Sequence, residues 1–178
     1  MEEIAMKKRM KWIACQMAAV MVAGCTVTGS VMAEESTEIS EGMFAWFLVQ
    51  AYDDACSING GKTDLWENEI EGQSAEEWIA ETAKTYTREY LAAKKKFEEQ
   101  GMELTEEEEE LIDTTVERYW NELGYGRYYQ DYGITEENFK DFLTNSQQVS
   151  RLYTDASEEL EKNITEEEIA SYIDEHGN

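Results

Sequence analysis

The sequence predicts an all-α protein, a bundle of about five helices in which two are long, at about residues 75–100 and 136–161. Apolar side chains recur at alternating steps of three and four residues along much of the chain, which is the spacing of one helix face. Serine or threonine N-caps followed by acidic residues stand where these patterns begin. The chain contains no proline, so the hydrogen bonding of a helix is nowhere interrupted by one.

The first 33 residues have the layout of an export signal. Basic residues between positions 7 and 11 precede a mostly apolar stretch that is short for a membrane-spanning helix. Two processing sites then compete. Val-Ala-Gly-Cys at 22–25 matches the lipobox of bacterial lipoproteins, in which Cys25 becomes the lipidated N-terminus. Val-Met-Ala at 31–33 fits ordinary cleavage after Ala33. We favour the lipobox because a cysteine at that place is the more specific match.

Either site predicts an exported protein. Lipidation would hold it at the outer face of the cytoplasmic membrane, touching the membrane through the lipid alone, whereas ordinary cleavage would release a secreted protein. A polar linker at 34–39 then leads from the signal segment, 1–33, to a single helical domain at 40–178.

The domain is expected to begin with a helix at 41–58, capped by Ser40. An irregular connection, 62–73, should follow, held against the core by Leu65, Trp66 and Ile70. The apolar side of the first helix carries Phe44, Phe47, Leu48, Ala51, Tyr52 and Ala55.

The first long helix has both ends marked. Ser74 and Glu77 form a capping box, and Gly101 supplies a left-handed stop. We expect the rest of the chain to be organised around this helix. Its narrow apolar face is made of Ile79, Ala83, Tyr86, Tyr90, Ala93 and Phe97.

Three threonine caps, Thr105, Thr135 and Thr165, start the remaining helices. The first of these helices should end at Gly124 and bury Ile112, Val116, Tyr119 and Leu123 on one face. The second runs to about residue 161 and forms an apolar seam able to pair with the first long helix: Phe139, Phe142, Ser146, Val149, Tyr153, Ala156 and Leu160. The third, 166–175, is short and should turn Ile169, Tyr172 and Ile173 inward.

The net charge of the chain restricts the classes of molecule that it can bind. The chain has 40 acidic and 15 basic residues, a formal net charge of −25. Such a balance argues against nucleic acid and against adsorption to anionic lipid, and it favours neutral or basic partners.

No catalytic constellation is recognisable. Cys56 as a nucleophile would need a histidine, and the single histidine is His176, close to the C-terminus, so Cys56 is expected to be structural. The acidic run 106–110 points in several directions around a helix and cannot converge on calcium. The sequence shows no zinc spacing and no phosphate-binding loop, so we predict no cofactor, no metal and no catalytic residue.

Aromatic residues gather around three glycines, at 124, 126 and 133. Two interpretations stand. The rings can wedge the bend between two helices, which we favour, or they can offer amphipathic contact area for a client polypeptide. The candidate client-binding residues are Trp120, Tyr125, Tyr128, Tyr129 and Tyr132, beside Tyr119.

Three segments carry a resemblance to a known family: GMELTEEEEELIDTTVERYWNELG, YGITEENFKDFLTNSQQVSRLYTDASEEL and NITEEEIASYIDEHGN. Their order and phrasing resemble the N-terminal helical chaperone domain of extracytoplasmic foldases of the SurA/PrsA type. In that family a short helix with the pattern T-x-E-E-I-x-x-Y-x-x-E leads into a parvulin prolyl-isomerase domain. The matching residues are Thr165, Glu167, Glu168, Ile169, Tyr172 and Glu175. The chain lacks the strand with a V-N-G turn that precedes the first helix in the family, and it lacks counterparts of the parvulin catalytic residues.

The resemblance implies a helical cradle that holds unfolded exported polypeptides, and this is the leading hypothesis. In one alternative the chain is the leading domain of a longer peptidyl-prolyl cis-trans isomerase whose catalytic domain lies beyond Asn178. In the other it is a surface helical-bundle lipoprotein that binds one folded partner.

Overall fold

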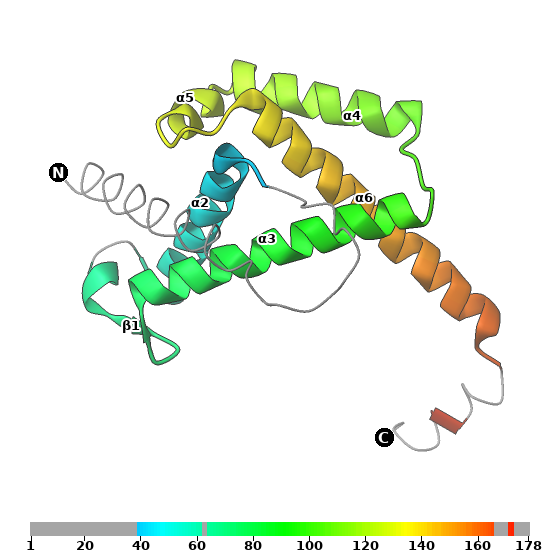
Figure 1. Cartoon of the computed structure of the whole chain (residues 1–178), viewed down its shortest axis with the longest axis horizontal. Helices are drawn as coiled ribbons and strands as arrows, with labels where there is room; N and C mark the ends of the chain where they lie inside the picture. Colours follow the sequence, from blue (N-terminus) through cyan, green and yellow to red (C-terminus); the bar gives the residue numbers. More distant parts are fainter. Residues whose placement is uncertain (1–38, 62–63, 166–170, 173–178) are drawn as a thin grey trace, which may run out of the picture.

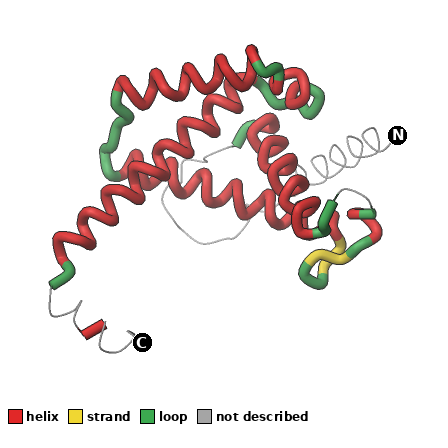
Figure 2. The backbone as a smooth tube through the Cα atoms, turned by 180° about the vertical axis from the view of Figure 1, so that it is seen from behind, coloured by secondary structure: helices red, strands yellow, loops and turns green. Residues whose placement is uncertain are grey.

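A computed structural model describes residues 39–61, 64–165 and 171–172, and it confirms the predicted all-α fold (Figure 1). Short strands and turns connect the helices (Figure 2). The proposed signal segment with Cys25, most of the linker and most of the last predicted helix lie outside the described residues. The elements, in chain order, are α2 (Glu41–Ile58), η1 (Leu65–Glu67), β1 (Glu69–Ile70), β2 (Gln73–Ser74), α3 (Ala75–Glu99), α4 (Glu106–Val116), η2 (Glu117–Glu122), α5 (Tyr125–Gln130) and α6 (Glu136–Asn163).

α2 lies at the centre of the fold. It has the predicted bounds, and the Ser40 hydroxyl accepts a hydrogen bond from the Met43 amide at 3.2 Å. The predicted apolar side is buried, and so are side chains outside it, among them Met43, Trp46 and Cys56. α2 is therefore covered on most of its circumference. The sequence pointed to α3 as the organising element, but α2 is the more deeply buried of the two.

α3 packs across α2 with the predicted face. The capping box of Ser74 and Glu77 forms, and the rings of Tyr86 and Tyr90 lie 6.4 and 5.6 Å from the ring of Phe47. The Tyr86 hydroxyl also donates to Asp54 Oδ2 at 2.6 Å. This hydrogen bond to a carboxylate raises the pKa of Tyr86 to about 12.

The connection between α2 and α3 contains a small hairpin that the sequence did not reveal. β1 and β2 pair antiparallel, with Ile70 opposite Gln73. Glu71 and Gly72 between them both have positive φ, as a type I′ turn requires. The expected anchors are confirmed: Leu65 and Ile70 are buried, and Trp66 stacks on Tyr52 at 5.8 Å.

The register predicted after Val116 is wrong. Tyr119 and Leu123 were expected inside, yet they are 41% and 54% exposed, while Trp120 is 4% exposed. The cause is η2, a π-helical segment in which the Leu123 amide donates to the Arg118 carbonyl. Each such turn contains one residue more than an α-turn, so the inward position moves from residue 119 to residue 120. Gly124, with φ of 73°, ends the segment as expected.

α6 has two unlike halves. Its first half packs on α2, α3 and α4, with Phe139 buried and Phe142 half-buried against the core. Its second half, residues 149–163, extends away from the other helices in both views (Figures 1 and 2). Here Val149, Tyr153 and Leu160 are exposed, so the predicted seam pairs with α3 only along the first half. Tyr172, expected to face inward, is 66% exposed.

Candidate binding surface

The aromatic residues predicted as a client-binding site are mostly interior. Trp120 is 4% and Tyr132 8% exposed, and Tyr128 and Tyr129 are half-buried against the core. The Trp120 ring stacks against Tyr129, at 6.1 Å, and against Phe139, at 5.7 Å. These rings fill the space between η2, α5 and α6, in agreement with the wedge interpretation.

Gly126 shows how tight this wedge is. A Cβ atom at this position would lie 2.6 Å from Trp120 Nε1, closer than real side chains approach. Glycine is therefore required so that the backbone of α5 can lie against the indole ring. Trp120 is fixed in the interior by this contact and is not free to meet a partner.

Tyr125 is the exception among the five predicted residues. It is 50% exposed and stacks on Tyr119 with 6.0 Å between ring centres and 15° between ring planes. The guanidinium of Arg118 lies 5.9 Å from the Tyr119 ring centre. Together with exposed Leu123 these residues form a small aromatic patch on η2 and α5.

A longer apolar surface lies on the second half of α6. Val149 is 47%, Tyr153 75% and Leu160 63% exposed, and Ala156 lies between them on the same face. Steps of four, three and four residues align these side chains along the helix, and we call them the α6 row. The sequence shows this pattern, and the pattern alone predicts a packing seam.

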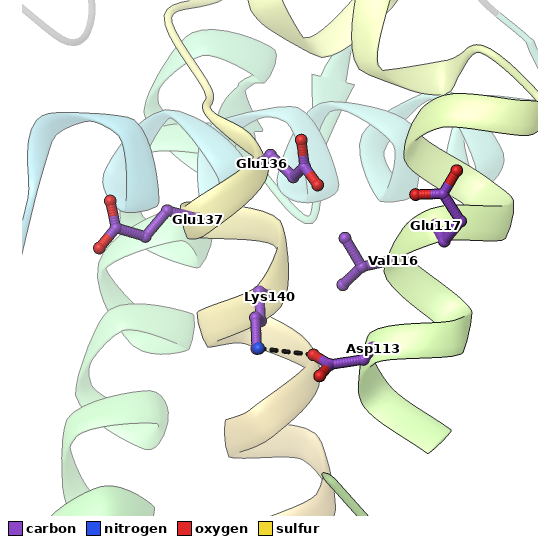
Figure 3. A pocket seen from close by; sticks show the side chains of 6 residues that line it. All are labelled: Asp113, Val116, Glu117, Glu136, Glu137 and Lys140. Atoms are coloured by element: carbon purple, nitrogen blue, oxygen red, sulfur yellow. Dashed lines mark ion pairs between the residues drawn. The ribbon is translucent and has the colours of Figure 1, made fainter. Parts of the chain in front are cut away.

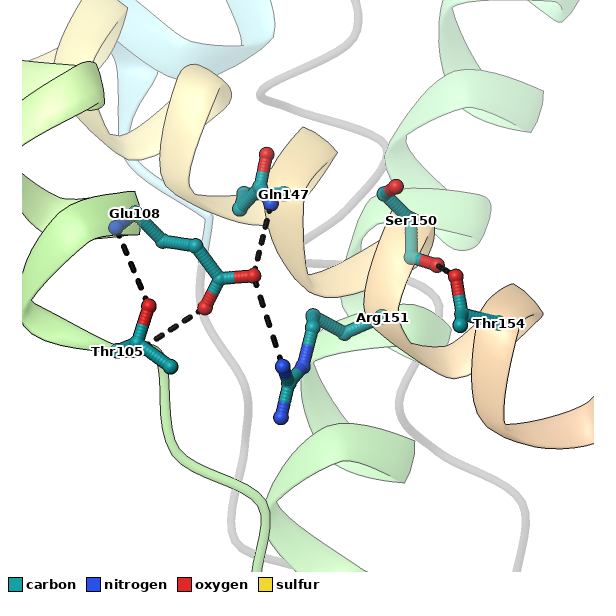
Figure 4. A network of polar contacts seen from close by, with 6 residues as sticks. All are labelled: Thr105, Glu108, Gln147, Ser150, Arg151 and Thr154. Atoms are coloured by element: carbon teal, nitrogen blue, oxygen red, sulfur yellow. Dashed lines mark hydrogen bonds and ion pairs between the residues drawn. The ribbon is translucent and has the colours of Figure 1, made fainter.

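A polar network anchors α6 where the row begins (Figure 4). Glu108, near the start of α4, accepts a hydrogen bond from Gln147 Nε2 at 3.0 Å, and Arg151 lies 3.8 Å from the same carboxylate. Glu108 also accepts from the Thr105 amide at 2.8 Å as part of the α4 capping box. This backbone hydrogen bond, helped by Gln147 and Arg151, holds the pKa of Glu108 below its usual value.

Asn145 adds a contact on the side of α3. Its side chain is 8% exposed and donates to the Tyr90 carbonyl at 3.1 Å. The Glu108 network and Asn145 therefore clamp α6 from α4 and from α3 at residues 145–151, where the row begins. Beyond these contacts the helix continues with its apolar row uncovered by the described residues.

A shallow groove of about 420 Å³ lies between α4, η2 and the start of α6 (Figure 3). Val116 lines it together with carboxylates from both walls, including Glu117 and Glu136. Asp113 and Lys140 pair across it at 2.5 Å, which raises the pKa of Lys140. Within the described ranges, no three His, Cys, Asp or Glu side chains come together as a metal site requires.

Comparison of the chain with protein-family models, with curated proteins and with solved structures found no match. In the part of the chain that the structure describes, no helix combines the length and apolar character needed to cross a bilayer. The candidate site therefore rests on its geometry. It consists of the α6 row, with the Tyr119, Leu123 and Tyr125 patch as a second exposed apolar area.

Proposed function

We propose that the protein holds unfolded segments of exported polypeptides on the α6 row, without catalysis by the described residues. The observation that carries this proposal is the exposure of Val149, Tyr153 and Leu160 at helical spacing on a half-helix that extends from the fold. Large apolar side chains aligned on one exposed face are a usual mark of an interaction surface.

The geometry suits weak and broad binding. The row is an exposed, convex helix face, so it offers contact area without demanding a particular shape from the ligand. Complete burial of a fully exposed leucine or valine side chain contributes roughly 1.5–3 kcal/mol. Leu160 and Val149 contribute less, because they are already partly covered. A few such contacts, reduced by the cost of ordering a flexible segment, give modest affinity.

The surrounding charge supports the same function. A net charge of −25 keeps a complex with an apolar client dispersed, since the acidic surfaces of neighbouring molecules repel one another. The likeness to SurA/PrsA-type helical domains is consistent with the proposal. Export and lipidation at Cys25 remain part of it, because a client-holding protein of this kind would meet its clients outside the cytoplasm.

The test is suppression of aggregation. The full chain is mixed with several unrelated unfolded proteins, and light scattering is followed for the unaltered chain and for a Tyr153→Ser/Leu160→Ser variant. We expect the unaltered chain to slow aggregation of most clients and the variant to lose most of that effect. A matched control, Ile58→Ser/Leu111→Ser, removes two apolar side chains that are 55% and 60% exposed on other helices.

Circular dichroism shows whether each variant keeps its fold. Equal suppression by the unaltered chain and the Tyr153→Ser/Leu160→Ser variant would contradict the proposal. Binding of one folded protein with no effect on unfolded clients would favour the adaptor alternative. Prolyl-isomerase activity of the 178-residue chain would show that catalytic groups are present after all.

A further inference from the structure

We infer that the α6 row selects apolar segments flanked by lysine or arginine, which names the client class and rests on the function proposed above. Charged side chains border the row, and most of them are acidic. Residues 149–163 carry four acidic side chains, Asp155, Glu158, Glu159 and Glu161, and two basic ones, Arg151 and Lys162.

Both basic side chains already have partners on this chain. Arg151 lies 3.8 Å from the Glu108 carboxylate, and Lys162 lies 3.6 Å from Glu158. Asp155, Glu159 and Glu161 are exposed, and the structure gives their carboxylates no cation within ion-pair distance among the described residues. The charge left over along the row is therefore negative.

Helix geometry places two of these carboxylates beside the apolar side chains, one on each flank of the row. At about 100° per residue, Glu159 and Glu161 lie on opposite flanks of the row, and Asp155, four residues before Glu159, lies further round the helix on the Glu159 side. Two like charges at this spacing repel each other by roughly 0.2–0.5 kcal/mol in an isolated helix. A long cationic side chain of the client that reaches round the helix to Glu159 relieves that repulsion, while its neighbours along the client contact Tyr153 and Leu160.

The occupant that fits these charges is an unfolded polypeptide segment in which an apolar core is bordered by lysine or arginine. An acidic client of the same core is repelled by the same carboxylates and by the net charge of −25. A second copy of this chain carries those same carboxylates beside its own row, so charge disfavours it as the occupant.

The experiment uses the full chain and three labelled peptides with one shared apolar core of leucine, phenylalanine and valine. Their ends carry lysines, serines or glutamates. Fluorescence anisotropy at low salt gives the affinity of each. We expect the lysine-flanked peptide to bind roughly threefold to tenfold more tightly than the serine-flanked one, given the usual strength of exposed ion pairs.

An Asp155→Asn/Glu159→Gln variant should lose most of this preference while still binding the serine-flanked peptide. It removes a like-charge pair from α6, so the helix is not weakened. The matched control is Glu106→Gln/Glu110→Gln, two exposed carboxylates four residues apart on α4, and it should keep the preference. The preference should also shrink at 0.5 M salt, since screening shortens the range of charge interactions to less than about 10 Å.

Failure of the inference and failure of the proposed function look different. Equal binding of all three peptides, with loss of binding in Tyr153→Ser/Leu160→Ser, would overturn the charge selection and leave the holding function intact. No binding of any peptide would remove the proposed function and this inference together. If the α4 control lost the preference for the lysine-flanked peptide to the same extent, the preference would be due to overall charge. If sedimentation showed dimerisation through α6, the row would bind a second copy of the chain. Either result overturns the inference.

Discussion

α2 and the second half of α6 carry similar apolar patterns, but these side chains are buried in α2 and exposed in α6. α2 has ten buried residues in eighteen, and neighbouring elements cover it on most sides. In α6, Val149, Tyr153 and Leu160 are aligned as regularly, yet between 47% and 75% of each side chain is exposed. Periodicity defines an apolar face, but it does not show whether another part of the chain covers that face.

The difference arises from where the contacts of α6 end. Asn145 and the Glu108 network fix the helix at residues 145–151. The capping box of α6 stabilises its first turn. The Thr135 hydroxyl accepts from the Asn138 amide, and the Asn138 side chain donates to Ser40 at the start of α2. A helix held firmly along one half presents the other half in a fixed direction, which suits a binding surface.

The largest expected effect contrasts the same substitution in the two regions. Leu48 is 1% and Leu160 63% exposed. Leu48→Ala should lower the free energy of unfolding by about 2–5 kcal/mol, because it removes buried surface and leaves a cavity. Leu160→Ala should change it by less than about 0.5 kcal/mol. Urea unfolding followed by circular dichroism measures both, and a comparable loss in the two variants would mean that the α6 row is covered after all.

A second contrast divides the aromatic cluster. Tyr129 contacts Trp46 at 4.8 Å as well as Trp120, whereas Tyr125 is half exposed. Tyr129→Ser should cost about 2–4 kcal/mol of stability, close to other large-to-small changes in a core. Tyr125→Ser should cost no more than the roughly 0.5–1.5 kcal/mol of its stack with Tyr119. Thermal unfolding of the two variants checks this, and the reverse order would contradict the wedge.

Gly126→Ala tests how closely α5 packs on the Trp120 ring, because this packing decides whether the substitution raises or lowers stability. In an open helix the change should stabilise by up to about 1 kcal/mol, since alanine is the better helix former. Here the new methyl meets the Trp120 ring, so we expect a loss of about 1–3 kcal/mol. A Trp120→Phe background, with a smaller ring, should reduce the penalty. A gain in stability for Gly126→Ala alone would show that the contact is looser than described.

The sequence predicted much of this fold because its signals are local. Ser40, Ser74, Thr105 and Thr135 cap the helices as expected, since a capping hydrogen bond joins residues three apart in the chain. The π-helical register at Trp120 was missed because it depends on Gly126 and Phe139, which come close only in the folded chain.

The candidate site was harder to predict. Aromatic density pointed to Trp120 and Tyr132, which are buried, because residue type alone does not report exposure. The α6 row is visible as a pattern in the sequence, but the described residues leave it uncovered because of where α3 and α4 lie in space. The hairpin of β1 and β2 was missed because its strands are only two residues long.

The smallest expected effect is that of Glu108→Gln, which removes a carboxylate that contacts α6 near the boundary between its two halves. Hydrogen bonding lowers the pKa of Glu108 from 4.5 in the folded state. Its contribution to stability is therefore complete above about pH 4.5 and is lost as the pH falls through the lower, folded-state pKa. Glu108→Gln should be less stable than the unaltered chain by less than about 1 kcal/mol at pH 6. This difference in the free energy of unfolding, measured by urea unfolding, should narrow at pH 3. A difference independent of pH would contradict the lowered pKa of Glu108.

Hydrogen–deuterium exchange of the full chain, with and without an excess of an unfolded client, tests the central claim most directly. A bound client shields the α6 row and stabilises the half-helix that carries it, so amides in residues 149–163 should exchange more slowly when the client is present. Residues 41–58 of α2 should be unchanged, because they are already buried in the free protein. Protection confined to other segments, or no protection at all, would contradict the account.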